Sequence, residues 1–534
     1  MTSPLSAGLR GALAALPTRL AGRPWLMWLA LAAFAVVLLA PGRDDIPATD
    51  RDESRYAQAS RQIAETGDWI DIRFQDELRL KKPPGIYWLQ AGLRQFLALP
   101  DTIASYRLPS LLAGVLSVLL LLAVSRRLLA GPAAVLPPVL LACSFLLGVE
   151  ARLATTDAVL LLATLAAAGV LTLRWVGRPW PADDLLLALA LAAGILVKGP
   201  VAPALVAGMF AADLVLQRGR RLRGLFTWRA GLLLLVLVLP WFWLIAARHG
   251  AAFWQESLLQ DVAGKAVAVQ ESHGQPPGFY LLTLPLAAWP WAALLPAMLW
   301  FAWRERAQPL VQALVAWILP LWCLFELAPT KLVHYVLPTY PAWVLLGALA
   351  LAQRAEWPRW VSRACLLLLL LGALLLAAGI AALGSRFGAG AAGIVLFVAL
   401  LLAATVAVLW SALPRWVAPL ALAAAYAQLW TQVVPAMDEL WVSRRLAALA
   451  APWREACDAP AVAQGFTEPS LVFELGTRTR LGEPAALPPG TRCRLRIADE
   501  SNAPPTAEAI GEVRGFNYAR GRPVRLELRV EPAR

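Results

Sequence analysis

The chain has 534 residues, of which 59% are hydrophobic and 16% are charged. Soluble domains carry about 25% charged and about 45–50% apolar residues, so a water-soluble fold could not bury this much apolar surface. In a soluble protein the net charge of +13 would suggest nucleic-acid binding. Here the basic residues lie in short clusters between apolar runs, as in the cytoplasmic loops of membrane proteins, which predicts an α-helical polytopic membrane protein with no nucleic-acid partner.

Long apolar runs recur along the chain, for example over residues 25–40, 232–247 and 365–383. They approach or reach the roughly 17–25 residues that cross a bilayer. Counted and oriented by their flanking arginines and lysines, the runs predict about thirteen transmembrane helices and a cytoplasmic N-terminus. Residues 1–24 show no cleavage signal, so the first span is expected to be a retained signal anchor. An odd number of spans places everything after about Val434 outside the cytoplasm.

Residues 1–435 form the predicted transmembrane catalytic domain, and residues 42–106 form its long first external loop. Loops of this length are usually functional or disordered. The apolar spacing in this loop predicts one helix that ends at Gly67 and a second that starts at Pro84. We expect both helices to lie on the membrane surface.

The tail, residues 436–534, has no long apolar runs. Alternating stretches at residues 492–497 and 524–530 predict strands, so we expect a small periplasmic α/β domain. Cys457 and Cys493 both lie in this tail, where an oxidising compartment permits a disulfide between them. Spacing alone does not show proximity, so two unpaired thiols are the alternative.

The first candidate site follows the first span, at residues 49–56 (TDRDESRY). Asp52 and Glu53 are its candidate catalytic acids, and Arg55 and Tyr56 are candidate substrate-binding residues. In the structural alternative, Asp52 caps the helix and Glu53 interacts favourably with the helix dipole.

Two adjacent lysines, Lys81 and Lys82, directly precede the helix that starts at Pro84. A helix N-terminus presents free N–H groups to an anion, and the lysines add positive charge. The segment therefore predicts a phosphate-binding site. The alternative is that these lysines contact lipid headgroups.

Asp157 begins an apolar run at the predicted external membrane boundary, in the segment 150–157 (EARLATTD). A carboxylate at that depth is costly unless it is paired or functional. Arg152 is the obvious partner, so a simple ion pair is the alternative to a catalytic role for Asp157.

Further along the chain, Lys198, His273, Lys331 and His334 reach the same predicted boundary. For the two histidines, a satisfied structural role is the alternative. Cations could hold a leaving phosphate and a carboxylate could act on the acceptor or the sugar, as transfer from a lipid phosphate requires. The sequence has no nucleotide-binding glycine motif, which agrees with a lipid-linked donor.

In this order, the segments resemble the bacterial aminoarabinose transferases, which transfer a sugar from undecaprenyl phosphate to lipid A. They also resemble the related protein O-mannosyltransferases, all of the GT-C membrane fold. The resemblance covers most of residues 20–350. The motifs that carry it are Asp52-Glu53-x-Arg55-Tyr56-Ala57, Lys82-Pro83-Pro84 with Tyr87-Trp88, Ala151-Arg152 with Thr156-Asp157, Lys198-Gly199-Pro200, and Lys331 with Tyr335, Leu337-Pro338 and Pro341.

The resemblance implies the same number of helices, external juxtamembrane helices, a periplasmic C-terminal domain and an inverting transfer. It gives Asp52 the position of the family's essential acid and puts Lys82 near the lipid phosphate. Tyr87 and Tyr335 join the substrate-binding residues on the same basis. Where the family often has an acid, this chain has Lys81, so no metal site is assigned there. A divalent cation elsewhere is compatible with the sequence, and the sugar can differ from aminoarabinose.

We therefore expect a multi-pass inner-membrane glycosyltransferase in contact with membrane lipids. Its donor is a polyprenyl-phosphate-linked sugar, and its acceptor is a lipid A phosphate or a related glycolipid on the periplasmic side. The alternatives are a hydroxyl acceptor, as in the protein O-mannosyltransferases, a transporter of lipid-linked sugars, and a structural scaffold. Transporters tend to have repeated halves and charges near mid-membrane, whereas these charges gather on one side.

Overall fold

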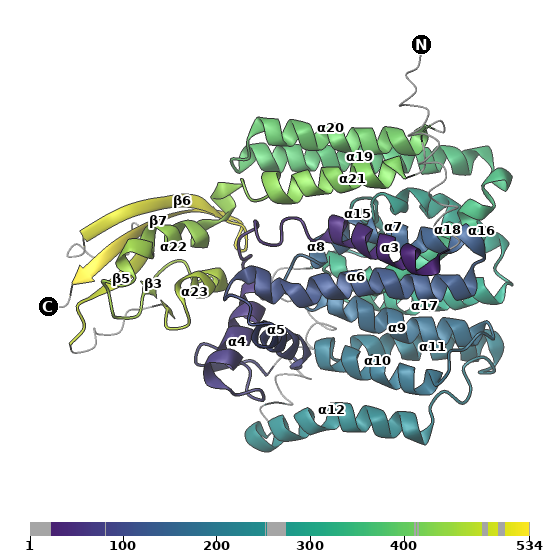
Figure 1. Cartoon of the computed structure of the whole chain (residues 1–534), viewed down its shortest axis with the longest axis horizontal. Helices are drawn as coiled ribbons and strands as arrows, with labels where there is room; N and C mark the ends of the chain where they lie inside the picture. The colour runs from purple at the N-terminus through teal and green to yellow at the C-terminus, as the bar shows by residue number, and fades with distance from the viewer. Residues whose placement is uncertain are drawn as a thin grey trace, which may run out of the picture.

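A bundle of long apolar helices makes up most of the chain, and a small α/β domain lies at one end of it (Figure 1). The structure, a computed structural model, describes residues 23–80, 82–250, 253, 274–410, 413, 416–482, 490–499 and 508–532. Within these ranges, seven helices are long and apolar enough to cross a membrane, and three shorter apolar helices accompany them. The predicted fold class is confirmed, while the count of thirteen helices stays a prediction.

The helices of the bundle differ in how deeply they are buried. The apolar stretch of α9 is 83% buried at the centre, whereas that of α12, at the edge of the bundle in Figure 1, is 17% buried. The helices are α3 (Pro24–Leu39), α6 (Ile103–Leu128), α7 (Leu136–Ala142), α8 (Phe145–Glu150), α9 (Asp157–Trp175), α10 (Asp183–Lys198), α11 (Val201–Gln217), α12 (Trp228–His249), α15 (Phe279–Ala287), α16 (Leu295–Arg304), α17 (Pro309–Leu327), α18 (Tyr340–Ala352), α19 (Arg359–Arg386), α20 (Ala391–Leu409) and α21 (Val417–Gln428).

The loop between α3 and α6 forms two helices at the end of the bundle that faces the α/β domain (Figure 1). The first, α4 (Asp52–Thr66), ends at Gly67, whose φ of 73° is left-handed and favours glycine. The second, α5 (Gly85–Phe96), starts directly after Pro84. Between them, β1 (Arg73–Phe74) and β2 (Glu77–Leu78) form a short antiparallel pair. Both predicted helices are confirmed, with the predicted glycine and proline at their ends.

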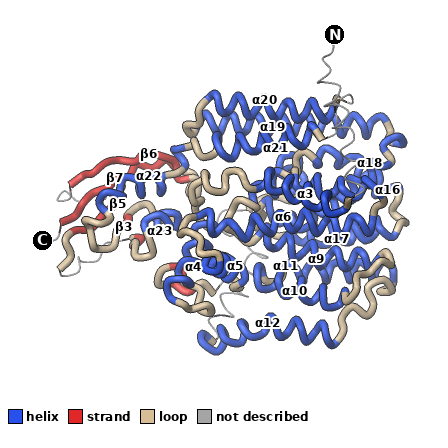
Figure 2. The backbone as a smooth tube through the Cα atoms, in the orientation of Figure 1, coloured by secondary structure: helices blue, strands red, loops and turns tan. Residues whose placement is uncertain are grey.

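The C-terminal domain has a five-stranded sheet in the order β4-β3-β5-β7-β6, with helices packed against it (Figure 2). Strands β5, β7 and β6 pair antiparallel, and β3 runs parallel to β4 and β5. The elements are α22 (Val442–Ala450), β3 (Val462–Ala463), α23 (Pro469–Leu475), β4 (Arg480–Leu481), β5 (Cys493–Asp499), β6 (Glu508–Asn517) and β7 (Arg522–Pro532).

The predicted α/β character of this domain and both predicted strands, now β5 and β7, are confirmed. Strand β6 was not predicted from the sequence. Cys457 and Cys493 form a disulfide, so the alternative of two unpaired thiols is wrong. The bridge joins the segment after α22 to the first residue of β5.

The C-terminal domain packs directly on the loop between α3 and α6. The Gln58 amide donates to Thr477 Oγ1 at 2.7 Å, and the Arg61 guanidinium donates to the Phe473 carbonyl at 2.8 Å. The same guanidinium lies 4.2 Å from the centre of the Phe473 ring. Contacts between α4 and α23 therefore place this loop and the C-terminal domain on the same side of the bundle.

A buried carboxylate, that of Glu53, ties the first loop to the bundle. Glu53 and Arg107 of α6 are almost fully buried and form a two-pronged ion pair, with Nε–Oε1 and Nη2–Oε2 distances of 2.7 and 2.9 Å. The backbone N–H groups of Thr49 and Ala154 also donate to this carboxylate, each at 2.8 Å. Arg107 donates in addition to the carbonyl groups of Arg43, Ile46 and Pro47. One side chain therefore links the start of α4, α6 and the segment before α9.

This environment keeps Glu53 ionised. Burial alone would raise the pKa of Glu53, but Arg107 and the backbone hydrogen bonds outweigh burial and hold the pKa below its ordinary value. The stabilisation is therefore present at neutral pH and is lost as the pH falls below the ordinary glutamate value of about 4.3.

We predict that Glu53→Gln lowers the thermal stability of the purified protein strongly at neutral pH. The substitution keeps the shape of the side chain and leaves Arg107 as a buried cation without its counter-charge. Removing one partner of a buried ion pair costs about 3–5 kcal/mol. The matched control is Glu77→Gln in the exposed β1–β2 hairpin, which should change the unfolding free energy by no more than about 0.5 kcal/mol. Equal melting temperatures for the two variants would contradict the anchoring role.

Candidate active site

Asp52 is the first residue of α4, and its side chain is 65% exposed. The residue that caps the helix is Arg51, with no side-chain cap hydrogen bond, so the alternative that Asp52 serves as the helix cap is wrong. The contact of Asp52 with Arg55 is long, at 4.0 Å. The carboxylate of Asp52 is therefore open to a ligand, whereas that of its neighbour Glu53 is enclosed and saturated with hydrogen bonds.

Two tyrosines and an arginine lie beside Asp52. The rings of Tyr56 and Tyr87 are 5.3 Å apart, and Arg79 Nε donates to the Tyr87 hydroxyl at 3.1 Å. The Arg79 guanidinium also lies 5.8 Å from the centre of the Tyr56 ring. Burial, together with the nearby Tyr87 and Asp52, raises the pKa of Tyr56 well above its ordinary value, so its phenol stays a hydrogen-bond donor.

Arg79 was missed in the sequence, although it lies two residues before Lys81 in one basic stretch. That stretch was a usable signal. Lys82 is half-buried and lies three residues before the start of α5. Lys81 lies outside the described residues, as does His273.

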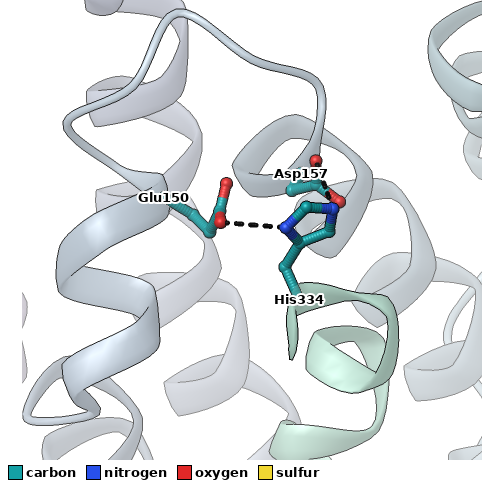
Figure 3. A group of neighbouring side chains, drawn as sticks. All are labelled: Glu150, Asp157 and His334. Carbon is teal, nitrogen blue, oxygen red and sulfur yellow. Dashed lines mark ion pairs between the residues drawn. The ribbon is translucent and has the colours of Figure 1, made fainter. Parts of the chain in front are cut away.

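A second group of charged side chains comes from α8, α9, α10 and the 3₁₀ helix η4 (Val333–Thr339). Lys198 Nζ lies 2.5 Å from Asp157 Oδ1. The His334 ring stands between two carboxylates, with Nδ1 3.3 Å from Glu150 and Nε2 3.7 Å from Asp157 (Figure 3). The Lys198 ammonium is also 5.4 Å from the Tyr335 ring. Glu150 was not assigned a role from the sequence, and His334 was considered there mainly as a structural residue.

Arg152 is not the partner of Asp157, so the alternative of a simple ion pair between these two residues is wrong. Its guanidinium donates to the carbonyl groups of Leu38, Pro41 and Gly148 and lies 4.9 Å from the ring of Trp430. Leu38 lies in the last turn of α3, where helix carbonyls lack intrahelical partners and an arginine with five donors can satisfy several of them.

Lys331 is likewise buried and engaged with the backbone. Its Nζ donates to the carbonyl groups of Gln275 and Ala328, at 2.8 and 2.7 Å. Arg152 and Lys331, both predicted to bind substrate, thus hold backbone segments in place in this structure.

The residue types of Glu150, Asp157 and His334 suit a divalent cation, and their candidate ligand atoms lie within 4.8 Å of one another. A metal site requires these atoms to converge on one point. Here the imidazole separates the two carboxylates and uses one nitrogen toward each, and Lys198 already supplies positive charge at Asp157. The arrangement fits an ion-paired cluster of two acids and two bases better than a metal centre, so no chemical step is routed through a metal.

Close packing brings the two groups of side chains together. Tyr56, Ile86 and Tyr87 share one buried apolar cluster with Ala158 of α9 and Val197 of α10. A Cβ on Gly85 would lie only 2.6 Å from the Leu196 carbonyl oxygen. Glycine at the start of α5 therefore permits the close approach of α5 to the end of α10 that carries Lys198.

A cavity of about 490 Å³ lies elsewhere, between α4, the start of α6 and the C-terminal domain. Its lining includes Arg61, nine residues after Asp52 along α4. Nine residues are about two and a half helical turns, so the two side chains point to opposite faces of α4. This cavity is therefore separate from the charged groups described above.

The comparisons with known proteins agree with this architecture. Residues 45–255 match the family described as dolichyl-phosphate-mannose-protein mannosyltransferase. An undecaprenyl phosphate-alpha-4-amino-4-deoxy-L-arabinose arabinosyl transferase from Pseudomonas paraeruginosa is 34% identical over 317 residues, which are 57% of this chain and 55% of the relative. The transferase of the same name from Edwardsiella ictaluri is 31% identical over 307 residues, 56% of this chain and 54% of the relative. The matches thus span just over half the length of these relatives.

The likeness in structure extends over nearly the whole chain. The crystal structure of ArnT from Cupriavidus metallidurans bound to undecaprenyl phosphate has a TM-score of 0.71 at 19% identity, covering 94% of this chain and 97% of that chain. The apo form of the same protein gives a TM-score of 0.71 at 20% identity, with 96% and 98% coverage. The resemblance that the sequence motifs predicted is confirmed, and the chain has the GT-C fold of the ArnT-like membrane glycosyltransferases.

Proposed function

We propose that this protein is an inner-membrane glycosyltransferase that moves a sugar from undecaprenyl phosphate to a lipid A phosphate or a related glycolipid. The observation that carries the proposal is the open carboxylate of Asp52 beside Tyr56 of α4 and Arg79 of the loop before α5. Helices α4 and α5 pack against the elements that carry Asp157 and Lys198. Acid and base side chains that face one space can hold a charged donor and act at its sugar carbon. The names of the relatives and the lipid bound in the ArnT structure support this donor.

In the proposed reaction, an acceptor oxygen attacks the anomeric carbon of the sugar as the bond from that carbon to the phosphate oxygen breaks. The electron pair of that bond leaves with undecaprenyl phosphate. Lys82 and Arg79 balance the negative charge that develops on the leaving phosphate, because fixed cations in a water-poor site stabilise such charge. Attack on the face opposite the phosphate gives the inverted product that the resemblance implies.

The role of Asp52 depends on the acceptor. A phosphate acceptor is already anionic and needs no general base, so Asp52 would orient the sugar hydroxyl groups. A hydroxyl acceptor must lose a proton, and the exposed carboxylate of Asp52 is the natural base for it. Asp52 thus acts at the sugar in the first case and at the acceptor hydroxyl in the second, and in both cases the cations act at the donor phosphate.

A protein hydroxyl acceptor is the second candidate, because the family that matches residues 45–255 is described as transferring mannose to protein. We favour lipid A or a related glycolipid as the acceptor. Such a molecule is amphiphilic, so it can enter the site sideways from the bilayer, as the lipid-linked donor must.

Mass spectrometry of lipid A separates the two acceptors. Lipid A from cells that express the protein should carry a pentosamine or hexosamine mass on a phosphate, and this mass should be missing when the gene is deleted. Unchanged lipid A under conditions of confirmed expression would refute the lipid A acceptor and favour a protein or another glycan.

We predict that Asp52→Asn lowers sugar transfer at least about a hundredfold, a factor that the loss of either a general base or an orienting contact at the reacting centre can reach. The change removes a charge and keeps the shape, so the melting temperature should stay that of the wild type. The matched control is Asp44→Asn, because Asp44 is an exposed acid of the same loop that pairs with Arg43. Asp52→Asn activity within a few-fold of the control would remove Asp52 from the chemistry.

The proposal also puts the C-terminal domain in the periplasm, because this domain packs on the loop between α3 and α6 that carries Asp52 and Lys82. A topology reporter inserted after Ala98 and one fused after Arg534 should both report the periplasm, and one inserted after Gly219 should report the cytoplasm. Opposite results for the first two reporters would contradict the packing of α4 on α23. A cytoplasmic result for both would overturn the orientation.

A further inference from the structure

Two parts of the C-terminal domain contact the residues immediately before Asp52. The Asp50 backbone N–H donates to the Tyr518 hydroxyl at 2.5 Å, and Ser470 Oγ donates to Asp50 Oδ1. The guanidinium of Arg51 donates to the carbonyl of Ala519. Tyr518 and Ala519 lie in the turn between β6 and β7, and Ser470 lies in the first turn of α23. Backbone and side chains of two consecutive residues are thus held from outside the bundle.

The segment held in this way has an unusual backbone conformation. Arg51 has φ 62° and ψ −112°, in the region of positive φ that residues with a Cβ rarely adopt. Such a conformation persists only where the surroundings fix it, and it is commonly found at functional sites. On the far side of Asp52, Glu53 is fixed by Arg107. Asp52 therefore sits between two clamped residues, and the first clamp belongs to the C-terminal domain.

We propose that Tyr518 and Ser470 are positioning residues for Asp52, so that the docked C-terminal domain sets the direction of the Asp52 carboxylate and is needed for full activity. This inference rests on the proposed function of Asp52. Neither residue touches the sugar or the phosphate in this scheme, because Tyr518 acts through the backbone N–H of Asp50 and Ser470 acts through the Asp50 carboxylate.

The clamp contains a titratable group, Asp50. Its carboxylate faces Arg51 from its own segment and Glu468 from the residue before α23. Glu468 in turn pairs with Arg520 of the β6–β7 turn at 3.2 Å. Burial is the main cause that raises the pKa of Asp50 to about 7. The Tyr518 hydroxyl accepts from the Asp50 backbone N–H and is close enough to the Asp50 carboxylate for the two groups to interact electrostatically.

The hydroxyl groups of Ser470 and Ser443 can hydrogen-bond with Asp50 whether its carboxyl group is ionised or protonated. Ser443 Oγ lies 2.6 Å from Ser470 Oγ, and Ser470 contacts Asp50. When Asp50 is ionised, Ser470 donates to it. When Asp50 is protonated, it can donate to Ser470, which then donates to Ser443. The clamp therefore stays connected in both states, but the buried charge makes docking weaker when Asp50 is ionised.

The sign of the pH effect follows from the two pKa values of Asp50. An undocked Asp50 titrates near its ordinary value of about 3.9, whereas the docked one titrates at about 7. The free energy of docking of the C-terminal domain therefore becomes less favourable as the pH rises from about 4 to about 7, and it changes no further above pH 7. Asp50→Asn removes this loss, so that variant should be more firmly docked than the wild type at pH 8.

Kinetics of the full-length protein test the positioning role. Tyr518→Phe removes the acceptor for the Asp50 N–H, and Ser470→Ala removes the donor to its carboxylate. Each should lower kcat by about two- to tenfold, the factor that the loss of one hydrogen bond corresponds to, while KM for the donor stays unchanged. The control is Thr477→Ala, which loses contacts to Gln58 and Glu65 at the same domain interface but none to residues 50–51. Unchanged kcat in both Tyr518→Phe and Ser470→Ala would overturn the inference.

Hydrogen exchange separates this inference from the proposed function, because it requires no substrate. At pH 8 the backbone of residues 49–55 should exchange faster in Tyr518→Phe than in the wild type and more slowly in Asp50→Asn. If the wild type transfers no sugar but these exchange differences appear, the proposed function fails while the clamp stands. If the wild type transfers sugar and exchange is the same in all three proteins, the clamp is refuted while the proposed function stands.

Discussion

The buried ion pair of Glu53 and Arg107 is the contact on which the rest of the candidate site depends. Its carboxylate receives hydrogen bonds from the backbone before α4 and from the backbone before α9, and its guanidinium binds three carbonyl groups after α3. A charge buried this deeply is tolerated only when it is fully paired. The segments that carry Asp52 and Asp157 are therefore held to one point in the bundle.

Asp52 and Glu53 are adjacent, but their side chains point in different directions because both residues lie on helix α4. Consecutive side chains on α4 diverge by about 100°, so Glu53 points into the bundle while Asp52 points out of it. The C-terminal domain holds the other side of the same turn through Asp50 and Arg51. The direction of the exposed Asp52 side chain can thus be fixed by neighbouring residues that are themselves held in place, so that an open site keeps a fixed geometry.

Local signals in the sequence predicted local structure well. Gly67 and Pro84 marked the ends of α4 and α5, and alternation marked β5 and β7. Strand β6 was missed because glycines at 511 and 515 and an irregular register near Ala509 interrupt its pattern. Partners far apart in the chain could not be predicted. An ion pair of Arg152 with Asp157 was the alternative to a catalytic role for Asp157, but in the fold Arg152 meets α3 carbonyls and Asp157 meets Lys198. Arg79 was missed although it belongs to the same basic stretch as Lys81 and Lys82, because its contacts with Tyr56 and Tyr87 arise only in the fold.

The most direct test of the account follows the donor phosphorus during turnover by the purified protein. Phosphorus NMR distinguishes the phosphodiester of undecaprenyl-phosphate-linked aminoarabinose from the monoester of free undecaprenyl phosphate. The account predicts that, with lipid A present, the donor's diester signal falls and the monoester signal of undecaprenyl phosphate rises in equal amount, while the same amount of lipid A phosphate changes from a monoester to a sugar-linked diester. A donor diester signal that persists in the presence of lipid A, with folded protein and bound donor, would contradict it.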